Sequence, residues 1–254
     1  MCLVIAAVEA SAHYELLFAA NRDERHARPS AAAHWWRDQP SIFGGRDLVA
    51  RGSWLAVDRG GRLAAVTNFR ESDTSAAPRS RGALVVDYLR DGGAIDDFAH
   101  ALQARQDDYG PFSLLLRERG ELRCVSNRAP AARLQRGVHA LSNAAYGVEW
   151  PKVRSARAGM QELLESRAAV EGLFALLAER VSVRSAEERY MTSHFIEGEV
   201  YGTRSSTVVL VDRTGTLTVA ERSFDSAARI THEVRESFEL AEPRGARSAA
   251  REPL

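Results

Sequence analysis

The chain opens with MCLVIAAVEA (residues 1–10), and this stretch decides how the rest of the sequence is interpreted. Residues 2–9 and 14–21 are two apolar runs joined by a short polar bend, a pattern that predicts a β-hairpin. Both runs are apolar throughout rather than alternating, as in strands covered on both faces. The same stretch places Cys2 directly after the initiator methionine. If Met1 is removed, Cys2 carries a free α-amino group beside its own thiol.

Further strands and helices follow from turn residues and apolar spacing. Hairpins are predicted within 53–69, 112–127 and 206–224, turning at Gly60–Gly61, Arg119–Gly120 and Thr214–Gly215, with one more strand at 137–143. Helical spacing is predicted in 80–93, 94–110 and most of 150–181, with Pro151 well placed in a first turn. Residues 27–36 are predicted to be loop.

The order of these elements predicts a single α+β domain. Tight turns between strands give antiparallel sheets, and strands buried on both faces favour two sheets stacked between helical layers. We therefore expect a four-layer αββα sandwich over residues 1–226. Apolar periodicity weakens afterwards, so 227–254 is predicted to be a C-terminal extension ending in a partly disordered tail.

Composition excludes several classes of protein. Apolar residues make up 45% of the chain, and 34 basic residues balance 34 acidic ones. This balance lacks the basic footprint of a nucleic-acid-binding protein. Cys2 and Cys124 are the only cysteines, too few for a disulfide scaffold or a multi-cysteine metal site. No signal peptide or membrane-spanning run is found, so a cytoplasmic protein is expected.

The usual catalytic motifs are missing from the sequence. It has no phosphate-binding loop, no dinucleotide fingerprint and no nucleophile elbow, and its seven histidines show no metal-ligand spacing. Cys2 needs no histidine, however, because an α-amino group with a pKa of roughly 7.7–8.0 can accept the thiol proton. Polar residues that bound otherwise apolar strands are candidate partners of this pair: Arg22, Asp23, Asn68, Asn143 and Arg204.

The motifs along the chain also resemble a known family. In order they are MC, NRDERHARP, FGGRD, SWLA, AVTNFR, SRGALV, FSLLL, SNR, LSN, WPKV, YGTRSSTVVLV and ERSF, within residues 1 to about 225. This ordered set resembles the transport and Golgi organisation protein 2 family, also called NRDE-motif proteins. That family is similar to the N-terminal-nucleophile hydrolases, and within that fold to cysteine amidases acting on bile salts and penicillin V.

The resemblance implies a role for each candidate residue. Cys2 is the nucleophile, its amine is the base, and Arg22 and Asp23 hold the thiol and the amine. Asn68 and Asn143 donate hydrogen bonds to the oxyanion or the substrate. Arg204 is a second clamp.

Two functions stay open at this stage. The first is an amidohydrolase that cleaves a non-peptide C–N bond through a Cys2 thioester and needs no cofactor. The second is a non-catalytic carrier for haem or for a lipid or acyl-CoA, with any haem bound reversibly because no covalent attachment motif is present. The expected partner is a small-molecule amide or a hydrophobic ligand. Cys2 by itself also fits ordinary core packing.

Overall fold

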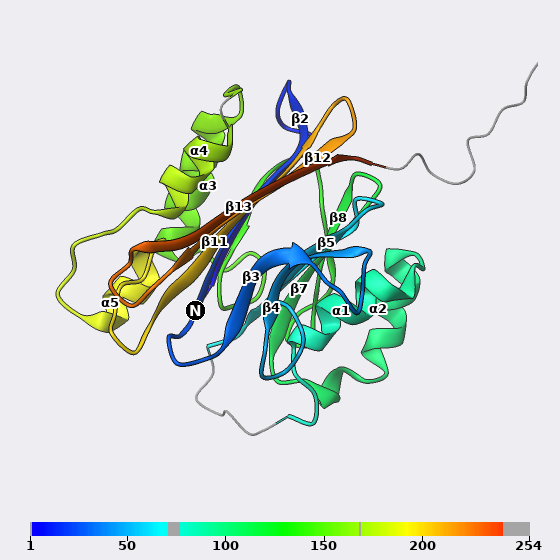
Figure 1. Ribbon diagram of the computed structural model, residues 1–254, viewed down its shortest axis with the longest axis horizontal. Helices are drawn as coiled ribbons and strands as arrows, with labels where there is room; N and C mark the ends of the chain where they lie inside the picture. The colour runs from blue at the N-terminus through cyan, green and yellow to red at the C-terminus, as the bar shows by residue number, and fades with distance from the viewer. Residues whose placement is uncertain (1, 71–76, 168, 241–254) are drawn as a thin grey trace, which may run out of the picture.

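The computed structural model describes residues 2–70, 77–167 and 169–240, which form two antiparallel sheets with helices on their outer faces (Figure 1). Sheet A has the strand order β10-β1-β2-β11-β12-β13, and sheet B has the order β3-β4-β5-β6-β7-β8-β9. The strands are β1 Leu3–Val8, β2 Tyr14–Arg25, β3 Ser30–Trp35, β4 Ile42–Asp47, β5 Leu55–Asp58, β6 Leu63–Asn68, β7 Phe112–Glu118, β8 Glu121–Ser126, β9 Ala132–Leu134, β10 Gly137–Leu141, β11 Tyr201–Asp212, β12 Thr216–Phe224 and β13 Ile230–Glu239. The helices are α1 Gly82–Asp91, α2 Ile95–Gln103, α3 Pro151–Leu163, α4 Ala169–Leu177 and α5 Ala186–Thr192, with a 3-10 turn at Gln106–Asp108.

β1 is buried on both faces because alternate residues enter two different cores. Val4 and Ala6 pack in the core between the two sheets. Leu3 and Ile5 pack in a second core, beneath α3 and α4. This arrangement explains why the strand is apolar at every position instead of alternating.

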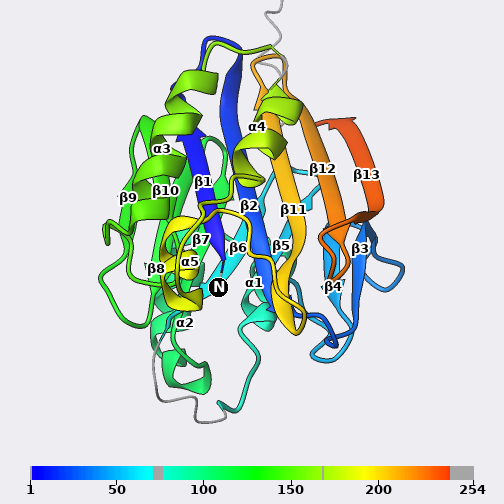
Figure 2. The ribbon, with the colours of Figure 1, turned by 90° about the vertical axis from the view of Figure 1, so that its left-hand side faces the viewer.

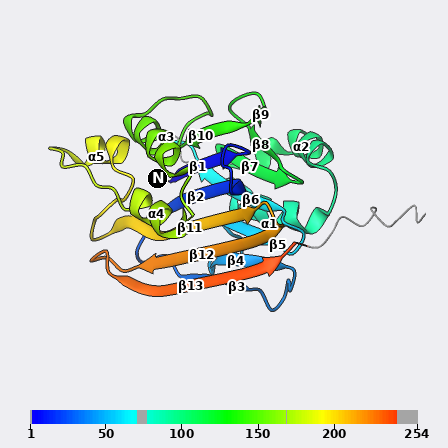
Figure 3. The same cartoon turned by 90° about the horizontal axis from the view of Figure 1, so that it is seen from above.

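The outer faces of the two sheets are covered by different helices. Helices α3 and α4 lie on sheet A, and α1 and α2 lie on sheet B, as the views in Figures 2 and 3 show. On sheet B, Tyr88 and Phe98 from the helices pack with Leu114 and Leu116 of β7. The four layers are helix, sheet, sheet and helix, as the sequence predicts.

The predicted hairpins are present, with turns that need left-handed backbone. Gly61, Gly120 and Gly215 have φ values of 80°, 79° and 88°. Glycine adopts this region without the steric penalty of a Cβ atom, which is why these positions end one strand and begin the next. The break between α1 and α2 at Gly92, with φ of 70°, follows the same rule.

Two stretches differ from the sequence-based expectation. The predicted loop at 27–36 contains β3, the edge strand of sheet B, because its backbone pairs with β4 although three successive alanines hide any alternation. The predicted C-terminal extension contributes β13, the edge strand of sheet A, whose mostly exposed side chains leave no apolar signal. The predicted tail from 241 onward lies outside the described residues.

The Gly44–Gly45 pair serves close packing rather than a turn. Both glycines lie within β4, and neither has positive φ. A Cβ atom on Gly45 would come within 2.1 Å of the Trp54 ring, and one on Gly44 would come within 2.7 Å of Ala56. Arg46, next to them, pairs with Asp38 at 2.5 Å.

Candidate active site

Cys2 lies immediately before β1, between the ends of two neighbouring strands. In the antiparallel pairing of β1 with β2, Leu3 is opposite Asn21, so the next register position sets Cys2 beside Arg22. The pairing of β1 with β10 continues in the same way and sets Asn143 on the other side of Cys2. Three candidate residues that are far apart in the sequence therefore meet at one end of sheet A.

Asp23 is a buried carboxylate at this end of the sheet, only 5% exposed. Its Oδ1 accepts a hydrogen bond of 2.7 Å from Oγ1 of Thr203 on the neighbouring strand β11. Burial raises the pKa of Asp23, and the charge of Lys152 and the hydrogen bond from Thr203 oppose that rise. A carboxylate held in this way favours a positive group close to it.

Arg22 is also buried, at 6% exposed, and its guanidinium is held in a fixed plane. It stacks 4.2 Å from the centroid of the Trp54 ring, a cation–π contact. One terminal nitrogen lies 3.5 Å from Oγ of Ser30, and the other lies 3.9 Å from a carboxylate oxygen of Asp47. Burial lowers the pKa of Arg22, while nearby Glu24 and Cys2 act in the opposite direction.

The two predicted asparagines join the ends of the two sheets. Nδ2 of Asn143 donates to the backbone carbonyl of Asn68 at 2.7 Å and lies 3.4 Å from its Oδ1. Next to them, Oγ of Ser142 donates to the Cys2 carbonyl at 2.6 Å, and Oγ1 of Thr67 donates to the Ser142 carbonyl at 3.2 Å. These bonds fix Cys2 and Asn68 relative to each other.

A cavity of about 230 Å³ opens at this place, and we call it the Cys2 cavity. It is lined by Cys2, Arg22, Asp23, Glu24, Arg28, Asp47, Ser53, Trp54, Val66, Thr67, Asn68, Ser80, Arg81, Gly82 and Tyr201. Four of the six predicted site residues thus line one cavity, and Asn143 lies behind it through its bonds to Asn68. Most of the lining residues are polar or charged.

Arg204 is the predicted residue that the structure does not bring to the Cys2 cavity. One terminal nitrogen of its guanidinium donates to the carbonyl oxygens of Arg25, His26 and Arg28, at 2.9, 3.0 and 3.2 Å. Arg204 therefore fixes the turn after β2, and it lines a neighbouring cavity that shares Arg22 and Trp54 with the first.

Two cationic residues near Cys2 were not predicted as site residues. Arg81 lines the Cys2 cavity just before α1; burial lowers its pKa, and Cys2 opposes this shift. Lys152, in the first turn of α3, is fully buried, and among the described residues its Nζ has no hydrogen-bond partner. Burial lowers the pKa of Lys152, with Asp23 and Cys2 opposing. Arg81 lies in the motif SRGALV and Lys152 in the motif WPKV, so these two motifs could have identified them as candidates.

Cys124 and the histidines contribute nothing to this site. Cys124 is packed in the core between the sheets, and burial raises the pKa of its thiol to about 12, which keeps it protonated and unreactive. Within the described residues, no group of three or more histidine, cysteine or acidic side chains is arranged to hold a metal ion. None of the helices in that part of the chain has the length and apolar character needed to cross a membrane.

Comparison with known sequences identifies relatives along most of the chain. The sequence profile described as transport and Golgi organisation 2 matches residues 1–226. The transport and Golgi organization protein 2 homologs of Bos taurus and Homo sapiens are 31% and 30% identical over 241 and 242 residues, covering 83% of this chain and 87% of each relative. The Drosophila melanogaster protein is 24% identical over 249 residues, covering 84% of this chain and 88% of the relative.

Comparison with solved structures identifies the same fold in a distant sequence. A crystal structure of a conjugated bile acid hydrolase from Clostridium perfringens has a TM-score of 0.54 and 9% identity, covering 94% of this chain and 92% of that one. A second variant of that hydrolase gives a TM-score of 0.53 with the same coverage and identity. These matches confirm the predicted sandwich of antiparallel sheets, like that of the N-terminal-nucleophile hydrolases.

Proposed function

Because this chain belongs to the transport and Golgi organisation 2 family, whose name specifies no reaction, we propose its function from the site itself. We propose an amidohydrolase that cleaves the C–N bond of a linear, non-peptide amide, with Cys2 as nucleophile once Met1 has been removed. Met1 lies outside the described residues, so its removal is part of the proposal. The cytoplasmic location expected from the sequence also belongs to the proposal. The observation that carries the proposal is the meeting of Cys2, Arg22, Asp23 and Asn68 in one cavity.

The first step is attack by the Cys2 thiol. Its proton passes to the α-amino group of the same residue, and Sγ forms a bond to the carbonyl carbon of the amide. Electrons from the carbonyl double bond move to its oxygen, which becomes an oxyanion. The positive charges of Arg22 and Arg81 in the cavity wall favour the thiolate that forms during this transfer.

The oxyanion needs hydrogen-bond donors fixed in advance, and Asn68 supplies one. Nδ2 of Asn143 contacts the carbonyl and side-chain oxygens of Asn68, which restrains the Asn68 amide where it lines the cavity. Asn143 therefore acts as a positioning residue for Asn68. The resemblance implied that both asparagines donate hydrogen bonds to the oxyanion or the substrate, whereas this proposal gives that role to Asn68 alone.

Collapse of the tetrahedral intermediate breaks the C–N bond. The Cys2 ammonium returns its proton to the leaving nitrogen, which departs as an amine and leaves a thioester on Sγ. Water, activated by the freed α-amino group, then hydrolyses the thioester to a carboxylic acid and restores the thiol. The buried carboxylate of Asp23 stabilises the ammonium that appears twice in this cycle.

The polar lining favours catalysis over the carrier function. A haem or acyl carrier needs a mainly apolar pocket, and small-molecule sites are usually 300–1,000 Å³. The Cys2 cavity is about 230 Å³ and is lined by side chains such as Arg22, Asp23, Glu24 and Arg81. It has room for the reacting amide group, while the rest of a substrate extends through the opening.

The proposal is tested by alkylation and by activity on short-chain N-acyl-4-nitroanilides. Iodoacetamide is expected to modify Cys2 and not Cys124, because Cys2 lines the cavity whereas Cys124 lies in the core between the sheets with the pKa of its thiol raised to about 12. Nitroaniline release is expected from the wild type and from Cys124→Ala, and not from Cys2→Ala. Equal release by wild type and Cys2→Ala, or labelling of Cys124 alone, would contradict the proposal.

A further inference from the structure

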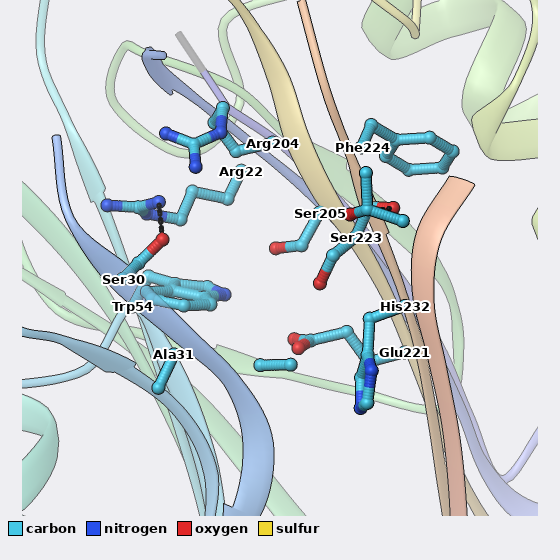
Figure 4. Close-up of a pocket in the computed structure, with 12 residues that line it drawn as sticks. Arg22, Ser30, Ala31, Trp54, Arg204, Ser205, Glu221, Ser223, Phe224 and His232 are labelled. Carbon is cyan, nitrogen blue, oxygen red and sulfur yellow. Dashed lines mark hydrogen bonds between the residues drawn. The ribbon is translucent and has the colours of Figure 1, made fainter. Parts of the chain in front are cut away.

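A second cavity lies on the other side of the Arg22–Trp54 stack, and the chemistry proposed for Cys2 does not use it. We call it the Glu221 cavity; its volume is about 190 Å³ (Figure 4). The lining residues that bear on its chemistry are Arg22, Trp54, Arg204, Ser205, Glu221 and His232. At roughly 30 Å³ of volume for each water molecule, it has room for a group of several non-hydrogen atoms.

Three buried polar atoms in this lining have no hydrogen-bond partner among the described residues. They are Nε of Arg204, Nε1 of Trp54 and Oγ of Ser205. Ser205 is only 3% exposed. A buried donor without a partner costs about 1–3 kcal/mol, so three of them around one cavity favour the binding of a group that accepts hydrogen bonds.

A β-bulge explains why Arg204 and Ser205 both line the cavity. On β11, Thr203 is opposite Asp23 and Ser205 is opposite Arg22, so Arg204 is an extra residue without a partner on β2. A regular strand would turn successive side chains to opposite faces of the sheet. The bulge re-aims Arg204, as bulges beside functional sites commonly do.

The chemical character of these groups selects an anionic ligand. Arginine and the tryptophan indole are donors only, and a serine hydroxyl donates equally well. The guanidiniums of Arg22 and Arg204 bring two positive charges to the cavity. Figure 4 shows the hydroxyls of Ser205 and Ser223 and the Trp54 nitrogen facing the same space. Among the described residues Arg204 has no ion pair, whereas Arg22 lies 3.9 Å from Asp47, so an anionic ligand would match chiefly the charge of Arg204.

Glu221 is the one acidic residue in the lining, and its environment keeps it compatible with an anion. It is 1% exposed, with Oε1 accepting from the Ala33 backbone at 2.7 Å and Oε2 accepting from Thr207 at 2.8 Å. Burial raises the pKa of Glu221 to about 7. The carboxyl is therefore neutral below pH 7, when it adds no negative charge to the cavity.

We propose that the Glu221 cavity binds an oxyanion, the carboxylate, sulfate or phosphate group of a small molecule, through Arg204, Ser205 and Trp54. This site is separate from Cys2 and stands whether or not Cys2 is catalytic. The guanidinium of Arg204, positioned by the bulge, supplies the positive charge. The unpartnered donors supply the directional hydrogen bonds.

Calorimetric titration with sulfate and, separately, with acetate tests the site and distinguishes a tetrahedral from a planar oxyanion. Saturable binding of at least one is expected in the wild type and unchanged in Cys2→Ala, so a failure of the catalytic proposal does not affect this test. Ser205→Ala is expected to weaken binding about ten- to a hundredfold, since it removes a hydrogen bond to a charged group. Trp54→Phe, which removes only the indole N–H from the donor set, provides a second variant if Ser205→Ala does not fold.

A pH series with sulfate, whose charge is constant, tests the role of Glu221. The other charged or titratable side chains that line the cavity are Arg22 from β2, Arg204 from β11 and His232 from β13. With a pKa of about 7, the neutral fraction of Glu221 falls about tenfold between pH 6 and pH 8, and sulfate affinity is expected to fall with it. Glu221→Gln is expected to remove this dependence, and His232→Asn is expected to keep it.

Two results would overturn the inference. One is the lack of saturable binding of both anions to the folded wild type. The other is binding that neither Ser205→Ala nor Trp54→Phe weakens, which would place the anion elsewhere on the molecule.

Discussion

The Cys2 cavity and the Glu221 cavity share one wall, the Arg22 guanidinium stacked on Trp54, and differ in the charged groups that surround them. In the first, a buried carboxylate, Asp23, lies near buried cations. In the second, donors remain without partners among the described residues, and the lone acid, Glu221, has its pKa raised to about 7. The first arrangement suits a charge that appears and disappears during a reaction. The second suits a charge that arrives with a ligand.

The difference follows from where each cavity lies in the sandwich. The Cys2 cavity is at the start of β1, where the ends of both sheets are joined through Asn68 and Asn143. The Glu221 cavity lies beside the β11 bulge, which brings two successive residues, Arg204 and Ser205, into the same lining. Neighbouring strands of sheet A thus provide two chemically different sites with a single shared wall.

The largest expected effect separates catalysis from binding. Cys2→Ala is expected to lower amide hydrolysis by a factor of about 10⁴ or more, because no other group in the cavity replaces the nucleophile. Oxyanion binding in the Glu221 cavity is expected to be unaffected. Turnover of the same nitroanilides and sulfate titration of the same preparation check both points. Loss of both properties together would show that the two cavities are one site.

The next effect concerns stability in the Glu221 cavity. Between pH 4.5 and 7 the folded protein keeps a proton on Glu221 that the unfolded chain has already released. The free energy of unfolding therefore falls as pH rises through this window, by about 3 kcal/mol for a shift of this size, and stays constant above it. Glu221→Gln is expected to remove this fall. Urea unfolding of both proteins at pH 5 and pH 8 measures the difference, and identical pH profiles would contradict the assignment.

A smaller effect is expected at the shared wall. In Gly45→Ala the new methyl group would meet the Trp54 ring at 2.1 Å, so the ring must move and the Arg22 stack with it. We expect a loss of about 1–3 kcal/mol in unfolding free energy, together with weaker turnover and weaker sulfate binding. Gly60→Ala, whose nearest neighbour is a side-chain oxygen of the half-buried Asp58 at 3.3 Å, serves as the control. If only turnover or only sulfate binding becomes weaker, the Arg22–Trp54 wall does not serve both cavities.

The smallest effect tests the charge pairing of the Cys2 cavity. Asp23 and Lys152 are both buried and influence each other's ionisation. The double variant Asp23→Asn/Lys152→Met is therefore expected to be more stable than the sum of the single changes, by about 1 kcal/mol. The exposed pair Arg157–Glu149 is the matched control, with a coupling below that value. If the two single changes in unfolding free energy add up to that of the double variant, Asp23 and Lys152 do not interact, which would contradict the charge pairing.

The sequence predicted the sandwich well because its turns and apolar runs are locally encoded. Gly61, Gly120 and Gly215 have positive φ and form the hairpin turns, so these turns can be found from the local sequence. The unbroken apolar run of β1 reflects burial on two faces. β3 and β13 were missed because edge strands need only backbone partners, and their side chains carry no periodic apolar signal.

The site was predictable only where strand ends carry its residues. Asn68 ends β6, and Arg22 and Asp23 follow the apolar run of β2, although the strand itself continues to Arg25. Strand register then brings Arg22 and Asn143 to Cys2. Arg81 and Lys152 reach the same place from the starts of helices, which depends on how the helices pack on the sheets. The destination of Arg204 depends on a one-residue bulge, and a bulge changes which face a side chain occupies without leaving a composition signal.

The central claim is that Cys2 is the first residue of the working protein, with its thiol and its amine both open to the cavity. Glyoxylate tests this directly, because an aldehyde condenses with an adjacent amine and thiol to a thiazolidine and releases one water. Intact-mass measurement is expected to show a chain lighter by one methionine that gains one glyoxylate less one water, and Cys2→Ala is expected not to react. A chain that keeps Met1, or a trimmed chain that does not form the ring, would contradict the claim.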